Sequence, residues 1–119
     1  MDANDDEDKH KAAALFQSMT ELWTKFKSVN EQRFAAVSAA ATALRGRRLN
    51  PEIRKLAYQE AHKLAGALGT FGLKEGSRVA KKIELLLVED LIDLTFFDEQ
   101  VAALREEIDR GPRPPDGSA

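Results

Sequence analysis

Two histidines, His10 and His62, are the side chains of this sequence best suited to chemistry near neutral pH, and no cysteine is present. His10 lies in an acidic run that we expect to fray, so His62 is the stronger candidate. An imidazole with a reference pKa of about 6.5 is largely neutral at neutral pH, and its free ring nitrogen can accept a phosphoryl group. The sequence shows no phosphate-binding glycine loop and no aspartate cluster suited to magnesium. The other groups needed for phosphoryl transfer would therefore come from a partner.

The candidate histidine lies in a predicted helix that begins at Asn50. Asn50 can cap the first turn, Pro51 suits the first helical position, and Glu52 interacts favourably with the positive end of the helix dipole. The apolar residues that follow have helical spacing and predict one buried face: Ile53, Ala57, Leu64, Leu68 and Phe71. The helix is expected to end near Gly72.

His62 is predicted to lie on the solvent face of this helix. At about 100° per residue, its side chain points roughly 160° away from that of Leu64, which marks the buried face. Gly66 and Gly69 follow on the exposed side, although glycine costs a helix interior up to about 1 kcal/mol relative to alanine. Their missing side chains would let another protein approach the imidazole closely.

The first helical segment carries an apolar stripe that changes phase part-way along. The stripe is formed first by Leu15, Met19, Leu22, Phe26 and Val29, and then, out of phase, by Phe34, Val37, Ala41 and Leu44. A straight helix over residues 9–44 would be about 54 Å long, which exceeds the depth of a small bundle. The segment is expected either to kink near residues 28–30 or to change the neighbour it packs against. Gly46 is expected to provide a left-handed cap.

Two further helices complete the predicted fold, one from residue 74 onward and one over about residues 94–108. Asp93 or Thr95 can cap the last helix, and the proline-rich segment after Gly111 ends it. No segment alternates with the two-residue period of a strand. We predict an all-α protein, an antiparallel four-helix bundle with an extended or kinked N-terminal helix. The expected boundaries are a disordered acidic N-terminus at 1–8, the bundle at 9–110 and a disordered C-terminal tail at 111–119.

The composition excludes several classes of function. With a net charge of −2 there is no basic surface to indicate nucleic acid as a partner. No apolar run approaches the roughly 20 residues that span a bilayer, and the acidic first residues do not form a secretory signal. We expect a cytoplasmic monomer that does not bind membranes.

Residues 61–73 read AHKLAGALGTFGL, and this run resembles the phosphorylation-site motif of histidine phosphotransfer domains, with His-x-Leu-x-Gly at its centre. The family consists of four-helix bundles. The resemblance implies a phosphocarrier of multistep phosphorelays and not an enzyme. His62 would take a phosphoryl group from the aspartate of a receiver domain and pass it to another receiver. Response-regulator receivers and a hybrid sensor kinase are the implied partners, and the chain itself needs no cofactor because Mg²⁺ is expected on the receiver.

The resemblance also implies roles for the neighbours of His62. Near-site support is assigned to Gln59, Lys63, Gly66 and Gly69, and docking of the partner to Lys55, Tyr58 and Ala65. Many family members have a lysine three residues after the histidine, where this chain has Ala65. Lys63 or Lys55 would then have to balance the charge of the phosphate.

Two other classes of function fit the predicted bundle less well. A docking bundle that binds receivers or other signalling domains without being phosphorylated is the main alternative, because the usual lysine is missing at Ala65. A metal-binding bundle would need inward-facing Glu-x-x-His pairs, and His62 has Gln59 at the glutamate position, so no metal site is expected.

Glu60 is a charged residue close to the predicted apolar face of its helix. Arg33 interrupts the apolar stripe of the first segment in a similar way. Because buried charges need partners, we predict that Glu60 and Arg33 pair across the bundle.

Overall fold

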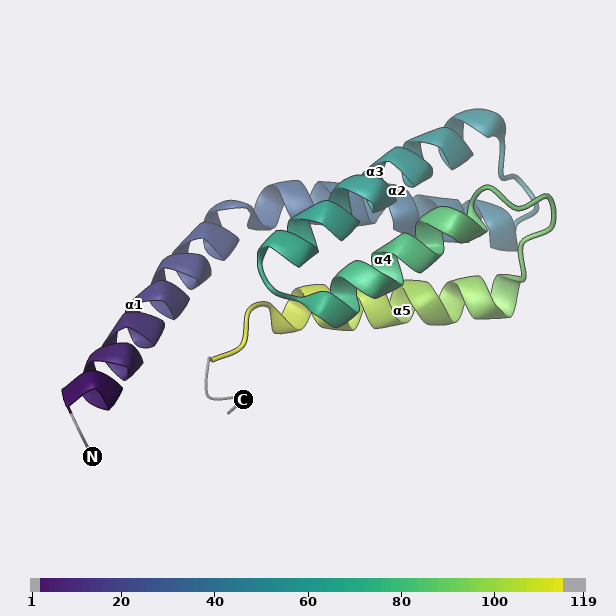
Figure 1. Cartoon of the computed structure of the whole chain (residues 1–119). Coiled ribbons are helices and arrows are strands. Elements are labelled where there is room, and N and C mark those ends of the chain that lie inside the picture. The colour runs from purple at the N-terminus through teal and green to yellow at the C-terminus, as the bar shows by residue number, and fades with distance from the viewer. Residues whose placement is uncertain (1–2, 115–119) are drawn as a thin grey trace.

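The computed structural model describes residues 3–114 of the 119-residue chain, which fold into helices joined by short loops (Figure 1). The helices are α1 (Ala3–Lys25), α2 (Lys27–Arg45), α3 (Pro51–Thr70), α4 (Lys74–Leu86) and α5 (Leu94–Arg110). Over the described range there is no strand. The all-α prediction is confirmed.

Helices α2 to α5 form the predicted four-helix bundle. Each packs against two others, in the cyclic order α2, α3, α4 and α5, and successive helices run antiparallel (Figure 1). The fully buried side chains that fill the centre come from all four helices: Val37, Leu64, Leu68, Val79, Ile83, Phe97 and Leu104. The histidine-bearing helix α3 is thus held on one side by α2 and on the other by α4.

The first helical segment bends at Phe26, earlier than the predicted range of 28–30. The backbone hydrogen bonds from Phe26 N to Leu22 O and from Asn30 N to Phe26 O continue through the bend, each at 3.0 Å. Beyond it, α2 joins the bundle, whereas α1 leads away from it (Figure 1), and Trp23 near the end of α1 packs against the core. The change in phase of the apolar stripe therefore marks the point where the chain leaves the bundle.

The described ends of the chain are the start of α1 and a short segment after α5. Helix α1 begins at Ala3 with Asp5 and Asp6 in its first turn, where acids interact favourably with the helix dipole. At the other end, Gly111 is buried with its Cα close to the Trp23 ring, and Arg113 pairs with Glu107. Residues 1–2 and 115–119 of the predicted tails lie outside the described residues.

The predicted helix caps are confirmed at two of three positions. Asn50 Oδ1 accepts a hydrogen bond from Ile53 N at 2.8 Å, and Asp93 Oδ1 accepts one from Phe96 N at 2.9 Å. The expected left-handed conformation at Gly46 is wrong. Gly46 has a φ of −85°, and the next residue, Arg47, adopts the positive φ of 54° instead. The turn after α2 contains one left-handed residue, and its backbone hydrogen bonds, from Arg47 N to Leu44 O and from Arg48 N to Ala43 O, place that residue one position later than predicted.

Arg105 on α5 links that helix to α2 within the bundle. Its guanidinium donates two hydrogen bonds to Glu31, at 2.6 and 2.8 Å, and lies 4.5 Å from the centroid of the Phe34 ring. These hydrogen bonds hold the pKa of Glu31 below its ordinary value of 4.5, although partial burial of the carboxylate acts in the opposite direction. Because Glu31 is 41% exposed, the pair contributes only modestly to stability.

We expect Arg105→Gln to lower the free energy of unfolding by about 1 kcal/mol at neutral pH, because both the ion pair and the ring contact are lost. A carboxylate whose pKa is lower in the folded state stabilises the fold above its unfolded pKa, and this contribution is lost as the pH falls. The difference from wild type should therefore shrink below pH 4.5. Urea unfolding at several pH values measures it.

Arg78→Gln serves as the control, because Arg78 pairs with Glu75 one turn away on the surface of a single helix. That variant should change stability by a few tenths of a kcal/mol. An Arg105→Gln variant as stable as Arg78→Gln at neutral pH would contradict the assignment.

Candidate phosphoacceptor site

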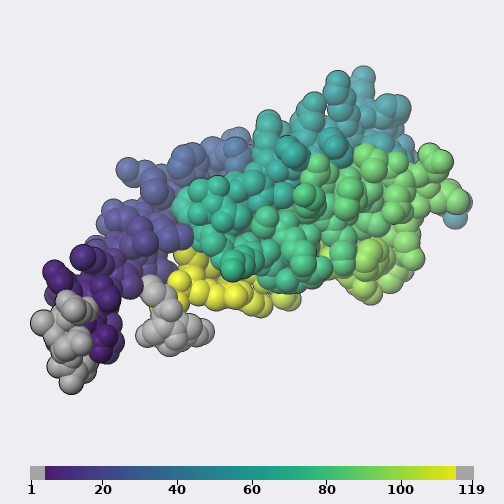
Figure 2. Space-filling view, in the orientation of Figure 1, coloured from purple at the N-terminus to yellow at the C-terminus, as the bar shows by residue number. Residues whose placement is uncertain are grey.

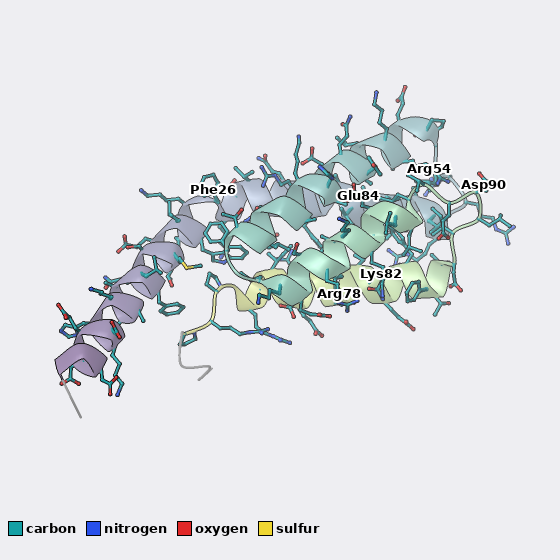
Figure 3. The ribbon with its side chains drawn as sticks, in the orientation of Figure 1. Phe26, Arg54, Arg78, Lys82, Glu84 and Asp90 are labelled. Carbon is teal, nitrogen blue, oxygen red and sulfur yellow. The ribbon has the colours of Figure 1, made fainter. Side chains whose placement is uncertain are left out.

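His62 lies on the exposed edge of α3 that faces α4. Its side chain is 71% exposed, as its helical phase predicted. Its Nδ1 atom lies 2.8 Å from Oε1 of Glu84 on α4, and Figure 3 shows Glu84 where α4 runs beside α3. One edge of the imidazole is therefore held by the protein, while the rest of the ring meets solvent.

The Glu84 carboxylate favours one tautomer of the His62 ring. An ionised carboxylate only accepts hydrogen bonds, so the neutral imidazole bonded to it carries its proton on Nδ1. Nε2 then keeps its lone pair, on the ring edge that is turned away from Glu84. The Glu84 side chain is only 11% exposed, so its position is fixed by packing and it orients the ring.

Two other contacts hold α3 and α4 in register around this pair. Ser77 Oγ donates a hydrogen bond of 2.7 Å to the carbonyl oxygen of Ala65. At the opposite end, Arg54 donates to the carbonyl oxygens of Leu87 and Glu89, at 2.6 and 3.0 Å. The loop after α4 is thereby tied to the beginning of α3 (Figure 3). These contacts flank the His62–Glu84 hydrogen bond on both sides.

The two glycines that follow His62 have different surroundings. A Cβ atom added at Gly66 would meet no other atom within 4 Å, so the surface one turn beyond the histidine is open. At Gly69 the same atom would lie 3.4 Å from Ser77 Oγ, in the contact with α4. Gly66 is thus placed to leave room beside the imidazole, and Gly69 is placed where the two helices approach each other.

The predicted cation next to the histidine is directed elsewhere. Lys63 Nζ lies 3.0 Å from Oε1 of Glu60, and this pair belongs to the α2 side of α3. The predicted pairing of Glu60 with Arg33 is wrong, because Arg33 donates to Asn30 Oδ1 at 3.4 Å. Glu60 finds its partner on its own helix instead.

Lys81 on α4 is a cation on the His62 side of the helix pair. It lies one turn from each of the two α4 residues that bond to α3, four positions after Ser77 and three before Glu84, and its side chain is exposed. Neighbouring Lys82 instead lies 5.5 Å from the centroid of the Phe96 ring on α5. By helical phase, Lys81 therefore lies on the side of α4 that carries Ser77 and Glu84, the two residues bonded to α3.

The residues predicted to dock a partner lie along the same edge of α3. Lys55 and Tyr58 line a hollow together with the loop after α4, whereas Ala65 is half-buried beneath Ser77. Gln59 is exposed one turn before His62. Helix α4 and the loop after it add two exposed apolar side chains that the sequence analysis did not select, Leu85 at 58% and Val88 at 63% exposure.

Glu84 is the main site residue that the sequence analysis missed. A signal was available, since Glu84 is a single acid within the otherwise apolar run Ile83–Val88. A charge at such a position needs a partner. Only the packing of α3 against α4 identifies that partner as His62.

Comparison with known proteins identifies the family of this chain. The family model of the Hpt domain matches residues 12–110, which include four-fifths or more of the chain and the whole bundle. The chain belongs to the Hpt domain family. Hpt domains are histidine phosphotransfer modules of phosphorelays, phosphocarriers rather than catalysts, and they interact with receiver domains.

This Hpt domain is also similar to part of one curated protein. Protein RcaC from Microchaete diplosiphon is 32% identical over 69 residues, which make up 58% of this chain and 11% of that protein. The matched region is thus a small part of the relative. No solved structure matches the chain.

No group of three or more histidine, aspartate or glutamate side chains in the described part of this Hpt domain is arranged to hold a metal ion. None of the helices described is both long and apolar enough to cross a bilayer.

We expect Glu84→Ala to shift the proton of His62 from Nδ1 toward Nε2, because the acceptor that holds it on Nδ1 is lost. Long-range ¹H–¹⁵N NMR correlations of the imidazole measure the tautomer directly. Glu84→Gln is the matched control, since its amide oxygen can still accept from Nδ1. An unchanged tautomer in Glu84→Ala would show that Glu84 does not orient the ring.

Proposed function

We propose that this chain carries a phosphoryl group on Nε2 of His62, which it receives from a receiver-domain aspartate and passes to a second receiver. The observation that carries this proposal is the pairing of an exposed imidazole with a buried carboxylate on one ring nitrogen only. That arrangement presents the other nitrogen to solvent as a nucleophile.

The transfer requires no proton to leave the site. The Nε2 lone pair attacks phosphorus, the N–P bond forms as the O–P bond to the aspartate breaks, and the aspartate departs as a carboxylate. The ring keeps its proton on Nδ1 and becomes positively charged. Glu84, at 2.8 Å, stabilises that charge, and the reverse reaction restores the neutral imidazole.

The partner supplies what the bundle does not provide. In this proposal the receiver contributes the aspartate, Mg²⁺ and the groups that bind the phosphoryl oxygens, while the bundle contributes a positioned nucleophile. The open surface at Gly66 lets the receiver's active site reach Nε2. Tyr58, Leu85 and Val88, each more than one-third exposed, form an apolar patch beside the histidine for the receiver to cover.

Lys81 takes the place of the lysine that many family members have at the position of Ala65. Its ammonium approaches from α4, over the space left by Gly66, and balances the charge of the phosphoryl group. Lys63 is less suited because Glu60 already holds it. Lys55 is two turns away along α3, about 10 Å, and lies beside the loop hollow.

The central test uses the full chain and phosphoramidate as a small-molecule phosphodonor. We expect one acid-labile, base-stable phosphohistidine, detected by ³¹P NMR and mass spectrometry, that is absent in His62→Gln and retained in His10→Gln. Adding purified receivers with Mg²⁺ should then remove the label. A label that survives in His62→Gln would overturn the assignment, and binding of receivers without any phosphohistidine would establish the docking-only alternative.

A second test concerns the cation. Lys81→Gln should slow transfer from phosphorylated His62 to a receiver several-fold, since a charge-assisted hydrogen bond to the phosphoryl group is worth about 1–2 kcal/mol. Lys82→Gln is the matched control on the next residue and should transfer at the wild-type rate. Single-turnover kinetics measure both. Equal rates for the two variants, or a larger effect in Lys63→Gln, would contradict the role of Lys81.

A further inference from the structure

Helix α1 carries an apolar face that the bundle leaves uncovered. Leu15 is 63% exposed, and Leu22 and Phe26 are each 47% exposed. These residues recur at the spacing of one helix face, which Met19 continues, and α1 meets the bundle at its C-terminal turn, where Trp23 packs against Phe71. The structure presents this stripe to solvent on a projecting helix.

The stripe forms one wall of a groove. The opposite wall comes from the turn between α3 and α4, where Phe71, Gly72 and Leu73 face Leu15 and Met19 across the opening. Figure 2 shows α1 extending from one end of the molecule, beside this end of α3. The groove consists of two adjoining hollows that share Leu15, Met19 and Phe71, with apolar side chains along α1 and charged side chains near the turn, a surface that can receive an amphipathic helix.

The two ends of this segment carry opposite charge. Residues 5–11 hold four acids against two lysines, whereas residues 25–33 hold Lys25, Lys27 and Arg33 against one acid, Glu31. Glu31 is already bonded to Arg105. A helix that crosses the groove in the antiparallel direction and has the same charge pattern would place acid against base at both ends.

We propose that the occupant of the groove is α1 of a second copy of this chain. The two α1 helices pack antiparallel about a twofold axis near Met19, so that stripe meets stripe and each acidic end lies over the partner's basic end. Such a contact uses the same patch on both subunits and closes after two copies. The apolar face that is exposed in one chain is then covered in the dimer.

The dimer leaves the His62 side chain of each copy accessible. His62 lies nine residues before Phe71 on α3, about 13 Å along the helix, and its free ring edge belongs to the side shared with α4. The dimer therefore presents two separate phosphoacceptor sites. The inference does not depend on the proposed function, and phosphoramidate labelling of His62 in each variant below tests that function separately.

The oligomeric state of the full chain is the first measurement. We expect light scattering and sedimentation equilibrium to show a dimer, and Leu15→Asp to convert it to a monomer with unchanged helical circular dichroism. Leu91→Asp is the control, since Leu91 is 89% exposed in the loop after α4 and should leave the dimer intact. A wild-type chain that stays monomeric at all concentrations would overturn the proposal.

The antiparallel arrangement can be tested by cross-linking because the chain contains no cysteine. Met19→Cys places one thiol near the proposed axis and should form a disulfide-linked dimer rapidly on mild oxidation. Ala12→Cys and Leu91→Cys lie away from the axis and should cross-link slowly. Rapid cross-linking of Ala12→Cys would indicate a parallel pair, and equal rates for all three variants would show that α1 does not form the contact.

Discussion

The hydrogen bond between His62 and Glu84 is the interaction that the bundle must hold in place. It joins an exposed ring on α3 to a carboxylate that packing removes from most of its contact with water. A carboxylate in that position is costly unless it is hydrogen-bonded, so the imidazole and the acid depend on each other. A shift of one residue between α3 and α4 would separate them, and the Ser77 and Arg54 contacts oppose such a shift.

The division of labour between this chain and its partners follows from the same geometry. In the proposed transfer, the bundle provides a rigid pair of helices and one oriented ring nitrogen, and in-line attack on phosphorus needs both. The open space at Gly66 admits the phosphorylated receiver, although glycine lowers the stability of the helix at this position. Stability is supplied elsewhere, by the buried apolar residues between the four helices and by the Arg105–Glu31 link at their far side.

Local signals in the sequence predicted much of this structure. The start of α3 at Asn50 and Pro51, the exposure of His62 and the bundle itself all follow from caps and helical periodicity, which depend on residues close together in the chain. Two features that the sequence did not predict depend on distant residues. Glu84 contacts His62 only when α4 packs on α3, and periodicity shows the apolar face of α1 but not what covers it.

Because Glu84 holds the His62 ring in one orientation, the imidazole by itself cannot distinguish one docking partner from another. In the proposed transfer, Glu84 presents the same nitrogen in the same orientation to every protein that docks here. Discrimination between such partners would then depend on residues outside the ring, such as the exposed side chains of Tyr58, Leu85 and Val88. The residues proposed to react and the residues proposed to select the partner are thus different parts of one surface. Partner preference can therefore diverge between related proteins while the reaction stays unchanged.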